Sequence, residues 1–246
     1  MAIANRIVSD KIEMTTKDEN GGYIRNLEKK NKKISSEIVC ISPNDISSKA
    51  EQFFEITNDA GRKLTYEMIN IMKLFTINWT GTDATINLNA LLDIYTIIGL
   101  TIIEMQRLIV EVNNQKLVSL QEHIVKSGSE CAVGKKLEQR LYMKTFINNL
   151  PTINETESIN LTPTFYSCVE RVAKSVTTHK NIISDLRILE NSIVNNLYSG
   201  CGREGIIDSF EALFAQAGDN QTMLEGISEK LNLIAENKQK QDITNT

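Results

Sequence analysis

A seven-residue stretch, Asn78 to Ala84, divides two long segments in which apolar residues recur every three or four positions. Apolar residues at this spacing predict amphipathic helices. The residues from Thr80 to Asp83 are weak helix formers that suit turns and helix starts. The stretch therefore predicts a tight turn between two antiparallel helices, with the indole of Trp79, the only tryptophan, folded back onto the crossing.

The first of these two helices is expected to begin at Ser42 and Pro43. Serine is a good cap, and proline is tolerated in the first turn because its missing N–H would have no partner there. Its apolar stripe is Ile46, Ala50, Phe53, Ala60, Leu64, Met68, Ile71 and Phe75. The second helix is expected from about Thr85 to Val125 and is longer than the first. Leu117, Leu120 and Ile124 are therefore expected to overhang, that is, to extend beyond the end of the first helix.

A second pair of amphipathic segments follows a polar linker. The third helix is expected to start at Leu161-Thr162-Pro163, with Thr162 as its cap, and to end at Tyr198-Ser199-Gly200-Cys201-Gly202. The fourth is expected from about Arg203, with Asn220 and Gln221 interrupting its apolar seam and a polar tail that frays after Glu236.

The two halves of the chain repeat one plan. Pro43 lies 36 positions before Trp79, and Pro163 lies 35 before Tyr198. Internal duplication on this scale indicates repeated supersecondary units. We therefore predict an all-α protein in which two tandem antiparallel helical hairpins form an elongated four-helix bundle. The alternative is a single irregular helical bundle in which the matching spacing is a coincidence.

This plan divides the chain into four segments. Residues 1–40 form an N-terminal extension that we expect to be partly flexible, and residues 41–126 form the first hairpin. Residues 127–160 form a linker, in which Lys135 to Leu150 has the partial apolar face of a short helix. Residues 161–240 form the second hairpin.

The charge balance argues against a nucleic-acid partner. The net charge is −4, and the one basic run, Lys29 to Lys33, is short enough to be a solvated segment. Aromatic residues make up only 6% of the chain, which argues against a β-sandwich.

The N-terminal residues lack the apolar core of a secretory signal peptide. The best apolar run, Ile94 to Ile103, is about half the length of a membrane span. Both faces of the helix are apolar there, so we expect this part to be contacted on more than one side. The sequence leaves membrane contact open.

No set of residues predicts a catalytic, cofactor or metal site. Cys40, Cys131, Cys168 and Cys201 have neither CxxC nor Cys/His ligand spacing, so buried or free thiols are expected, although an even count also permits disulfides. His123 and His179 are the only histidines, and His179 falls on the seam of the third helix. Gly200-Cys201-Gly202 places a thiol at a predicted turn, but no partner base is evident.

Trp79-Thr80-Gly81, between long amphipathic helices and followed by Ala84, resembles the WXG family of ESAT-like proteins in type VII secretion. Ile41-Ser42-Pro43 is similar to the usual start of the first helix in that family. The second hairpin departs from it, since Tyr198 stands for the tryptophan before Gly200. Nor does a Tyr-x-x-x-Asp/Glu export signal follow Leu224.

The resemblance implies a non-enzymatic protein that is secreted without a cleaved signal, or is cytoplasmic before export. Members of the family usually pair as dimers of hairpins, and this chain is similar to such a dimer fused into one polypeptide. Its implied partners are the secretion machinery or a co-secreted helical protein, and self-association stays open. Trp79, Gly81, Tyr198 and Gly200 are the expected turn and recognition residues, with the indole packed against the hairpin, displayed for recognition, or both.

Two other functions stay open. One is a helical membrane-active, pore-forming toxin component in which the Ile94–Ile103 region inserts. The other is a cytoplasmic structural adaptor that is not exported.

Overall fold

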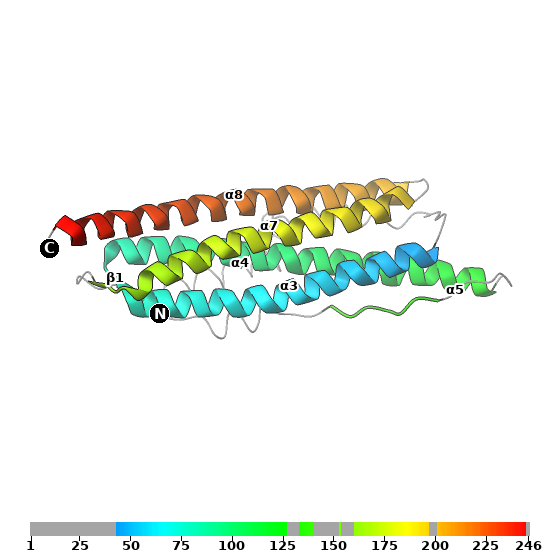
Figure 1. Ribbon diagram of the computed structural model, residues 1–246. Coiled ribbons are helices and arrows are strands. Elements are labelled where there is room, and N and C mark those ends of the chain that lie inside the picture. Colours follow the sequence, from blue (N-terminus) through cyan, green and yellow to red (C-terminus); the bar gives the residue numbers. More distant parts are fainter. Residues whose placement is uncertain (1–42, 127–132, 140–152, 154–159, 197–200, 245–246) are drawn as a thin grey trace, which may run out of the picture.

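In the computed structural model, the described residues are 43–126, 133–139, 153, 160–196 and 201–244, and four long helices dominate them (Figure 1). The helical elements are α3 (Pro43–Asn78), α4 (Thr82–Glu111), the π-helical η2 (Val112–Leu117), α5 (Val118–Lys126), α7 (Thr164–Asn196) and α8 (Cys201–Thr244). Two short strands, β1 (Trp79–Thr80) and β2 (Asn160–Leu161), complete the fold. The all-α prediction is confirmed.

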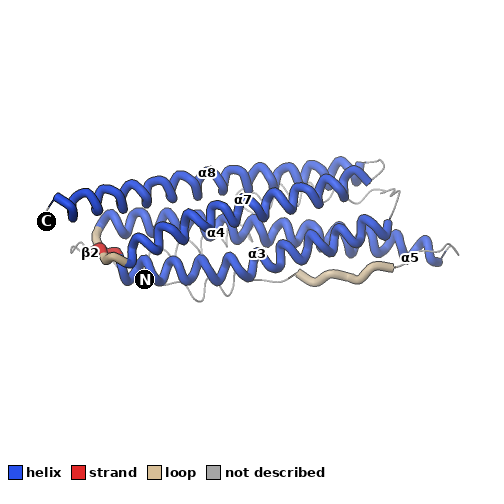
Figure 2. The backbone as a smooth tube through the Cα atoms, in the orientation of Figure 1, coloured by secondary structure: helices blue, strands red, loops and turns tan. Residues whose placement is uncertain are grey.

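The four long helices enclose one elongated core. Helix α3 packs against α4 and α7, and α8 packs against the same two helices. Thr162, just before α7, is hydrogen-bonded to Asn78 at the end of α3, so α7 starts where α3 ends. Phe53, near the start of α3, contacts Phe210, near the start of α8. Each helix is therefore antiparallel to both of its neighbours (Figure 2).

The first hairpin follows the predicted pattern with two differences. Helix α3 begins at Pro43 and ends just before Trp79, as expected. The second helix continues from α4 through η2 and α5 to Lys126, and its π-helical stretch was not expected. Leu117 is completely buried, so the prediction that it overhangs is wrong. Leu117 shares a hydrophobic cluster with Leu137, because the segment after the helix folds back onto it.

In the second hairpin, the last helix is longer than predicted, whereas α7 has about the predicted length. Helix α8 begins at Cys201, so Cys201 and Gly202 are helical and do not belong to the predicted turn. It continues to Thr244, so the prediction of a frayed tail after Glu236 is wrong. The sequence after Ile227 contains no glycine or proline and many Glu, Lys and Gln residues, which are good helix formers.

Several predictions lie outside the described residues. They concern residues 1–40, Ser42, Cys40, Cys131, Tyr198, Gly200 and most of the linker 127–160. Within the linker, residues 133–139 are described and are not helical, so the predicted short helix does not include Lys135 to Gln139. Residues 140–150 of that prediction lie outside the described part.

The buried apolar side chains form two clusters along the bundle. The corner core contains residues from Ala60–Trp79 of α3 and β1, Ala84–Ile102 of α4, Phe165–Val172 of α7 and Leu224–Ala235 of α8. The distal core contains residues from Ile46–Phe54, Met105–Leu117, Leu186–Val194 and Ile206–Ala217, together with Leu137. Between them lies a polar layer of buried side chains: Thr57, Thr101, Ser175, His179 and Asn220.

Candidate functional site

The turn at Trp79, which we call the corner, depends on a glycine. Gly81 has φ 112° and ψ 172°, a conformation that is essentially restricted to glycine. Its carbonyl accepts hydrogen bonds from the backbone N–H of Thr85 at 3.0 Å and from the Thr85 hydroxyl at 3.3 Å. These bonds start α4 directly after the turn, so the chain reverses within three residues.

The indole of Trp79 packs between the two hairpins. The ring centroids of Trp79 and Phe165 are 5.2 Å apart, and those of Phe165 and Phe75 are 5.7 Å apart. Trp79 is only 4% exposed. The structure therefore gives Trp79 a packing role at the contact between the two hairpins.

Backbone pairing fastens the second hairpin to the corner. Strands β1 and β2 are antiparallel, with Trp79 opposite Leu161 and Thr80 opposite Asn160. The backbone N–H of Thr162 donates to the Asn78 carbonyl at 3.0 Å. The Thr162 hydroxyl donates to Asn78 Oδ1 at 2.6 Å, so the residue predicted to cap α7 also ties the start of α7 to the end of α3. Sequence reasoning missed this pairing, although the proline after Thr162 favours extended backbone there.

A groove of about 840 Å³ lies between α3 and α7, near the middle of the bundle. Its apolar lining consists of Ile56, Ala60, Leu64 and Ile182, and its polar lining includes Glu55, Asp59, Lys63, Tyr66, Glu67, Arg171, Lys174, Ser175 and Thr178. The groove therefore has an apolar strip bordered by charges of both signs. Sequence reasoning missed it, because it is made by two helices that are far apart in the chain.

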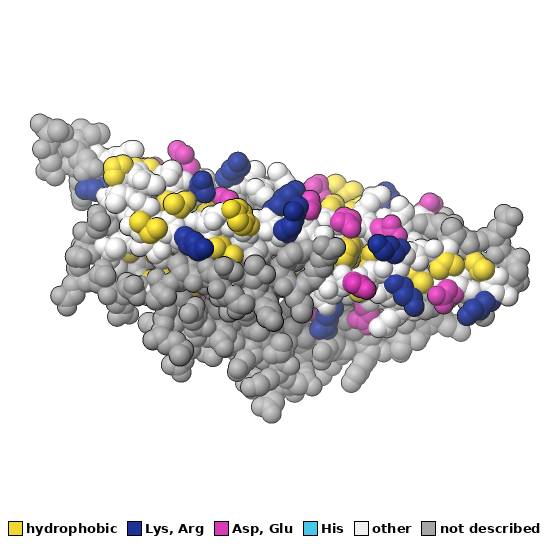
Figure 3. Space-filling view, turned by 90° about the horizontal axis from the view of Figure 1, so that it is seen from below, with side chains coloured by type: hydrophobic (Ala, Val, Ile, Leu, Met, Phe, Trp, Pro, Cys, Tyr) yellow, Lys and Arg dark blue, Asp and Glu magenta, His cyan; other side chains and the backbone are white. Residues whose placement is uncertain are grey.

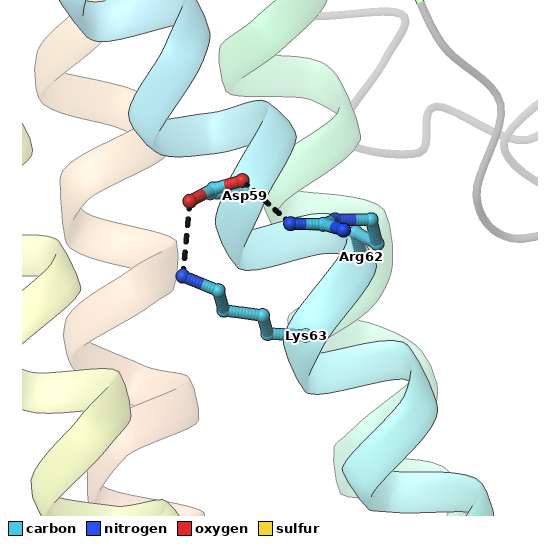
Figure 4. A network of polar contacts seen from close by, with 3 residues as sticks. All are labelled: Asp59, Arg62 and Lys63. Atoms are coloured by element: carbon cyan, nitrogen blue, oxygen red, sulfur yellow. Dashed lines mark hydrogen bonds and ion pairs between the residues drawn. The ribbon is translucent and has the colours of Figure 1, made fainter.

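Four of the charged side chains along the groove, Asp59, Lys63, Glu67 and Arg171, are engaged in exposed ion pairs. Asp59 accepts from Lys63 at 3.0 Å and from Arg62 at 3.2 Å (Figure 4). The hydrogen bond from Lys63, then that from Arg62, lowers the pKa of the Asp59 carboxyl. Arg171 of α7 lies 3.5 Å from Glu67 of α3 and links the two walls. Figure 3 shows positive and negative side chains interspersed over one face of the bundle.

The polar layer joins helices through side-chain amides. Asn220 Nδ2 of α8 donates to the Thr101 hydroxyl of α4 at 2.9 Å. His179 Nδ1 of α7 lies 2.7 Å from Gln221 Oε1, while Gln221 Nε2 donates to Glu225 at 2.7 Å. Because the Gln221 side chain presents its carbonyl oxygen to the ring, Nδ1 of His179 is the nitrogen that carries the proton. Asn220 and Gln221 thus interrupt the apolar seam because they cross-link the bundle.

His179 is almost fully buried, and only one of its ring nitrogens is paired. Its Nε2 has no hydrogen-bond partner within the described part of the chain. Burial lowers the pKa of the imidazole, and the hydrogen bond to Gln221 opposes this shift. The side chain is therefore held neutral by the core.

The Cys168 thiol is free and buried, and desolvation raises its pKa, which keeps it in the unreactive thiol form. Among the described residues, no group of three or more His, Cys, Asp or Glu side chains could hold a metal ion. Cys201 lies in the first turn of α8, and Tyr198 and Gly200 lie outside the described residues.

The corner, the groove and the polar layer are therefore the features from which function can be argued. The corner and the polar layer connect helices of this chain to one another, while the groove faces outward. A scan against protein-family models and searches of characterised proteins and of solved structures find no match to this chain.

Proposed function

We propose that this protein acts by binding other proteins through its helices, without catalysis, as a WXG-like component of a type VII secretion system. It serves as a secreted effector, or as the carrier or partner of one, and is cytoplasmic before export. The observation that carries the proposal is the Trp79–Gly81 corner, a tryptophan and a glycine in a tight turn between two long antiparallel helices.

The filled core decides where a partner can bind. The two hairpins bury their apolar stripes against one another, and all four long helices contribute to both clusters. Such a bundle needs no second hairpin subunit to complete it. A protein partner therefore binds on the outside of the bundle, and the groove between α3 and α7 is the best site for it.

The shape and chemistry of the groove suit an amphipathic helix. Its lining on α3 extends from Glu55 to Glu67, which corresponds to about 18 Å, or roughly three helical turns. The apolar strip matches the apolar stripe of a partner helix, and the mixed charges beside it select a complementary charge pattern. Tyr66 is 69% exposed at this groove, and tyrosine is enriched among residues that dominate binding energy.

Site-specific photocrosslinking tests the groove. A photoreactive phenylalanine analogue is placed at Tyr66, or at Ile77 as a control, because Ile77 is 71% exposed on the same helix and does not line the groove. In the producing cells we expect a discrete protein adduct from position 66 and none from position 77. Equal crosslinking from both positions, or none from either, would remove the groove from the proposal.

An export assay tests the assignment to type VII secretion. We expect the protein in the medium of producing cells, and its loss from the medium when the membrane ATPase of the system is deleted. Trp79→Phe keeps an aromatic ring in the corner but removes the Trp-x-Gly pattern, and Tyr166→Phe is the matched aromatic control near Phe165. We expect only Trp79→Phe to reduce export. Export that is independent of the ATPase would reject the assignment.

A further inference from the structure

The outward face of α4 differs from that of the other helices. Between Thr85 and Glu104, its positions that are not fully buried are Ile86, Asn89, Ala90, Asp93, Ile97, Gly99, Leu100 and Ile103. Ile86 is 57% exposed, Ala90 is exposed, and the other six are partly buried, with Leu100 and Ile103 packed against the corner core. The exposed positions of α8 include Glu204, Asp208, Glu211, Asp219, Glu225 and Glu229. A helix of a water-exposed bundle needs only one apolar face, whereas six of these eight outward positions of α4 are apolar or glycine.

The apolar part of α4 also has the length of a membrane span. Residues 84–103 are twenty residues with one charged side chain, Asp93. A helix of this length extends about 30 Å, which equals the hydrocarbon thickness of a bilayer. Within the described residues, Thr82–Gln115 is the one helix long and apolar enough to cross a membrane, and 56% of its most apolar window is buried in the bundle.

Four buried polar side chains of α4 donate hydrogen bonds within the helix itself. Thr85, Asn87, Thr96 and Thr101 each donate to the carbonyl four residues earlier, at 3.3, 2.7, 2.8 and 2.9 Å respectively. These bonds persist wherever the helix goes. A bilayer core offers no water, so polar groups that enter it must be satisfied internally. Asn87 Oδ1 and Asn89 Oδ1 have no hydrogen-bond partner within the described residues, so in the inserted state they must share the polar surroundings that Asp93 requires.

We propose that α4 inserts into a lipid bilayer as a spanning helix when the hairpin of α3 and α4 opens away from α7 and α8. The corner leads, because α4 begins there and Ile77 and Ile86 present exposed aliphatic side chains on either side of the turn. The partner is the apolar interior of an uncharged membrane, since the net charge of −4 gives no attraction to anionic lipid. This activity uses α4 and does not depend on the groove or on export.

Asp93 shapes the inserted state. An ionised carboxylate at the centre of a span is costly, so in a membrane it must face water or another polar group. Several α4 helices arranged around a wet centre satisfy this requirement, and the expected consequence is leakage through the bilayer.

The test uses the full-length protein and vesicles of phosphatidylcholine that contain a trapped dye, at pH 7.4 and pH 5. Ala90→Lys places a charge within the apolar segment at an exposed position, and Ala215→Lys places it at an exposed position of α8. Circular dichroism establishes that both variants are folded. We expect the wild type and Ala215→Lys to float with the vesicles and release dye, and Ala90→Lys to bind about tenfold more weakly or worse.

A second variant keeps the test decisive if Ala90→Lys does not fold. Asp93→Asn removes the only charge from the segment and should increase vesicle binding. No vesicle binding by the wild type at either pH overturns the proposal. Equal binding by the two lysine variants, or no gain with Asp93→Asn, overturns it as well, because lipid contact would then lie outside α4.

Discussion

The two ends of the bundle are closed by different chemistry. At the corner, the backbone of Trp79 and Thr80 pairs with that of Asn160 and Leu161 over an aromatic cluster. At the distal end, side-chain amides of the π-helical segment η2 hold residues 133–139 against the helix. The corner thus joins two hairpins through backbone, while the distal end secures a connecting segment through side chains.

The π-helical winding explains how the distal end works. Asn113 Nδ2 donates to the Lys135 carbonyl at 2.9 Å, and Asn114 Nδ2 donates to the Leu137 carbonyl at 2.7 Å. Two consecutive residues thus reach the same segment. A π-helical stretch carries an extra residue in its turn and often marks a functional position. The two ends therefore differ in what they depend on. The corner depends on the backbone conformation of Gly81, and the distal end depends on the π-helical winding of η2.

The largest expected effect comes from the corner. Phe165 is fully buried and contacts both Phe75 and Trp79, so Phe165→Ala should lower the free energy of unfolding by about 3–5 kcal/mol. Urea denaturation followed by circular dichroism measures it. Phe210→Ala is the distal control, since Phe210 is fully buried against Phe53, and it should cost a similar amount.

Both phenylalanine variants should unfold in one transition if the two ends form one cooperative unit. Two separate transitions would show that the corner core and the distal core unfold independently. A loss below about 1 kcal/mol for Phe165→Ala would contradict a packed aromatic cluster at the corner.

A smaller effect is expected at the distal end. Asn114→Ala removes the bond to the Leu137 carbonyl and the bond that the Leu137 N–H donates to Asn114 Oδ1 at 2.8 Å. The unpaired backbone groups should cost about 1–3 kcal/mol. Hydrogen exchange at the Leu137 amide should accelerate, whereas Gln115→Ala, at an exposed neighbouring position, should leave it unchanged. Unaltered protection in Asn114→Ala would show that the amide does not hold this segment.

The sequence predicts those parts of the fold that depend on local information. The apolar period places the four helices, and the weak helix formers from Thr80 to Asp83 place the corner. Gly81 is predictable because the turn requires a positive φ angle at this position, and glycine adopts such an angle without a steric penalty.

The parts that sequence reasoning missed depend on partners far apart in the chain. Thr162 is a suitable cap by its position before α7, yet its hydroxyl bonds to Asn78, 84 residues earlier. In the sequence, Asn220 is only an interruption of an apolar seam. Its role follows from the hydrogen bond to Thr101, which lies on another helix. The groove likewise needs α3 and α7 side by side, and no period within either helix encodes that neighbour.

The smallest expected effect lies in the polar layer between the two ends. Burial lowers the pKa of His179 below its ordinary value, so the folded protein binds fewer protons than the unfolded chain near that value. Stability should therefore fall as the pH drops through about 6.5, the pKa in the unfolded chain, towards the lower pKa of the folded state.

His179→Gln cannot be protonated and should escape this loss. Urea denaturation at pH 7.5, 6.5 and 5.5 measures the difference in unfolding free energy between the two proteins, which cancels the titration of groups they share. The wild type should lose stability relative to His179→Gln at each step down. A difference that stays constant with pH would mean that Nε2 finds a partner when it is protonated, and that the layer separating the two cores tolerates charge.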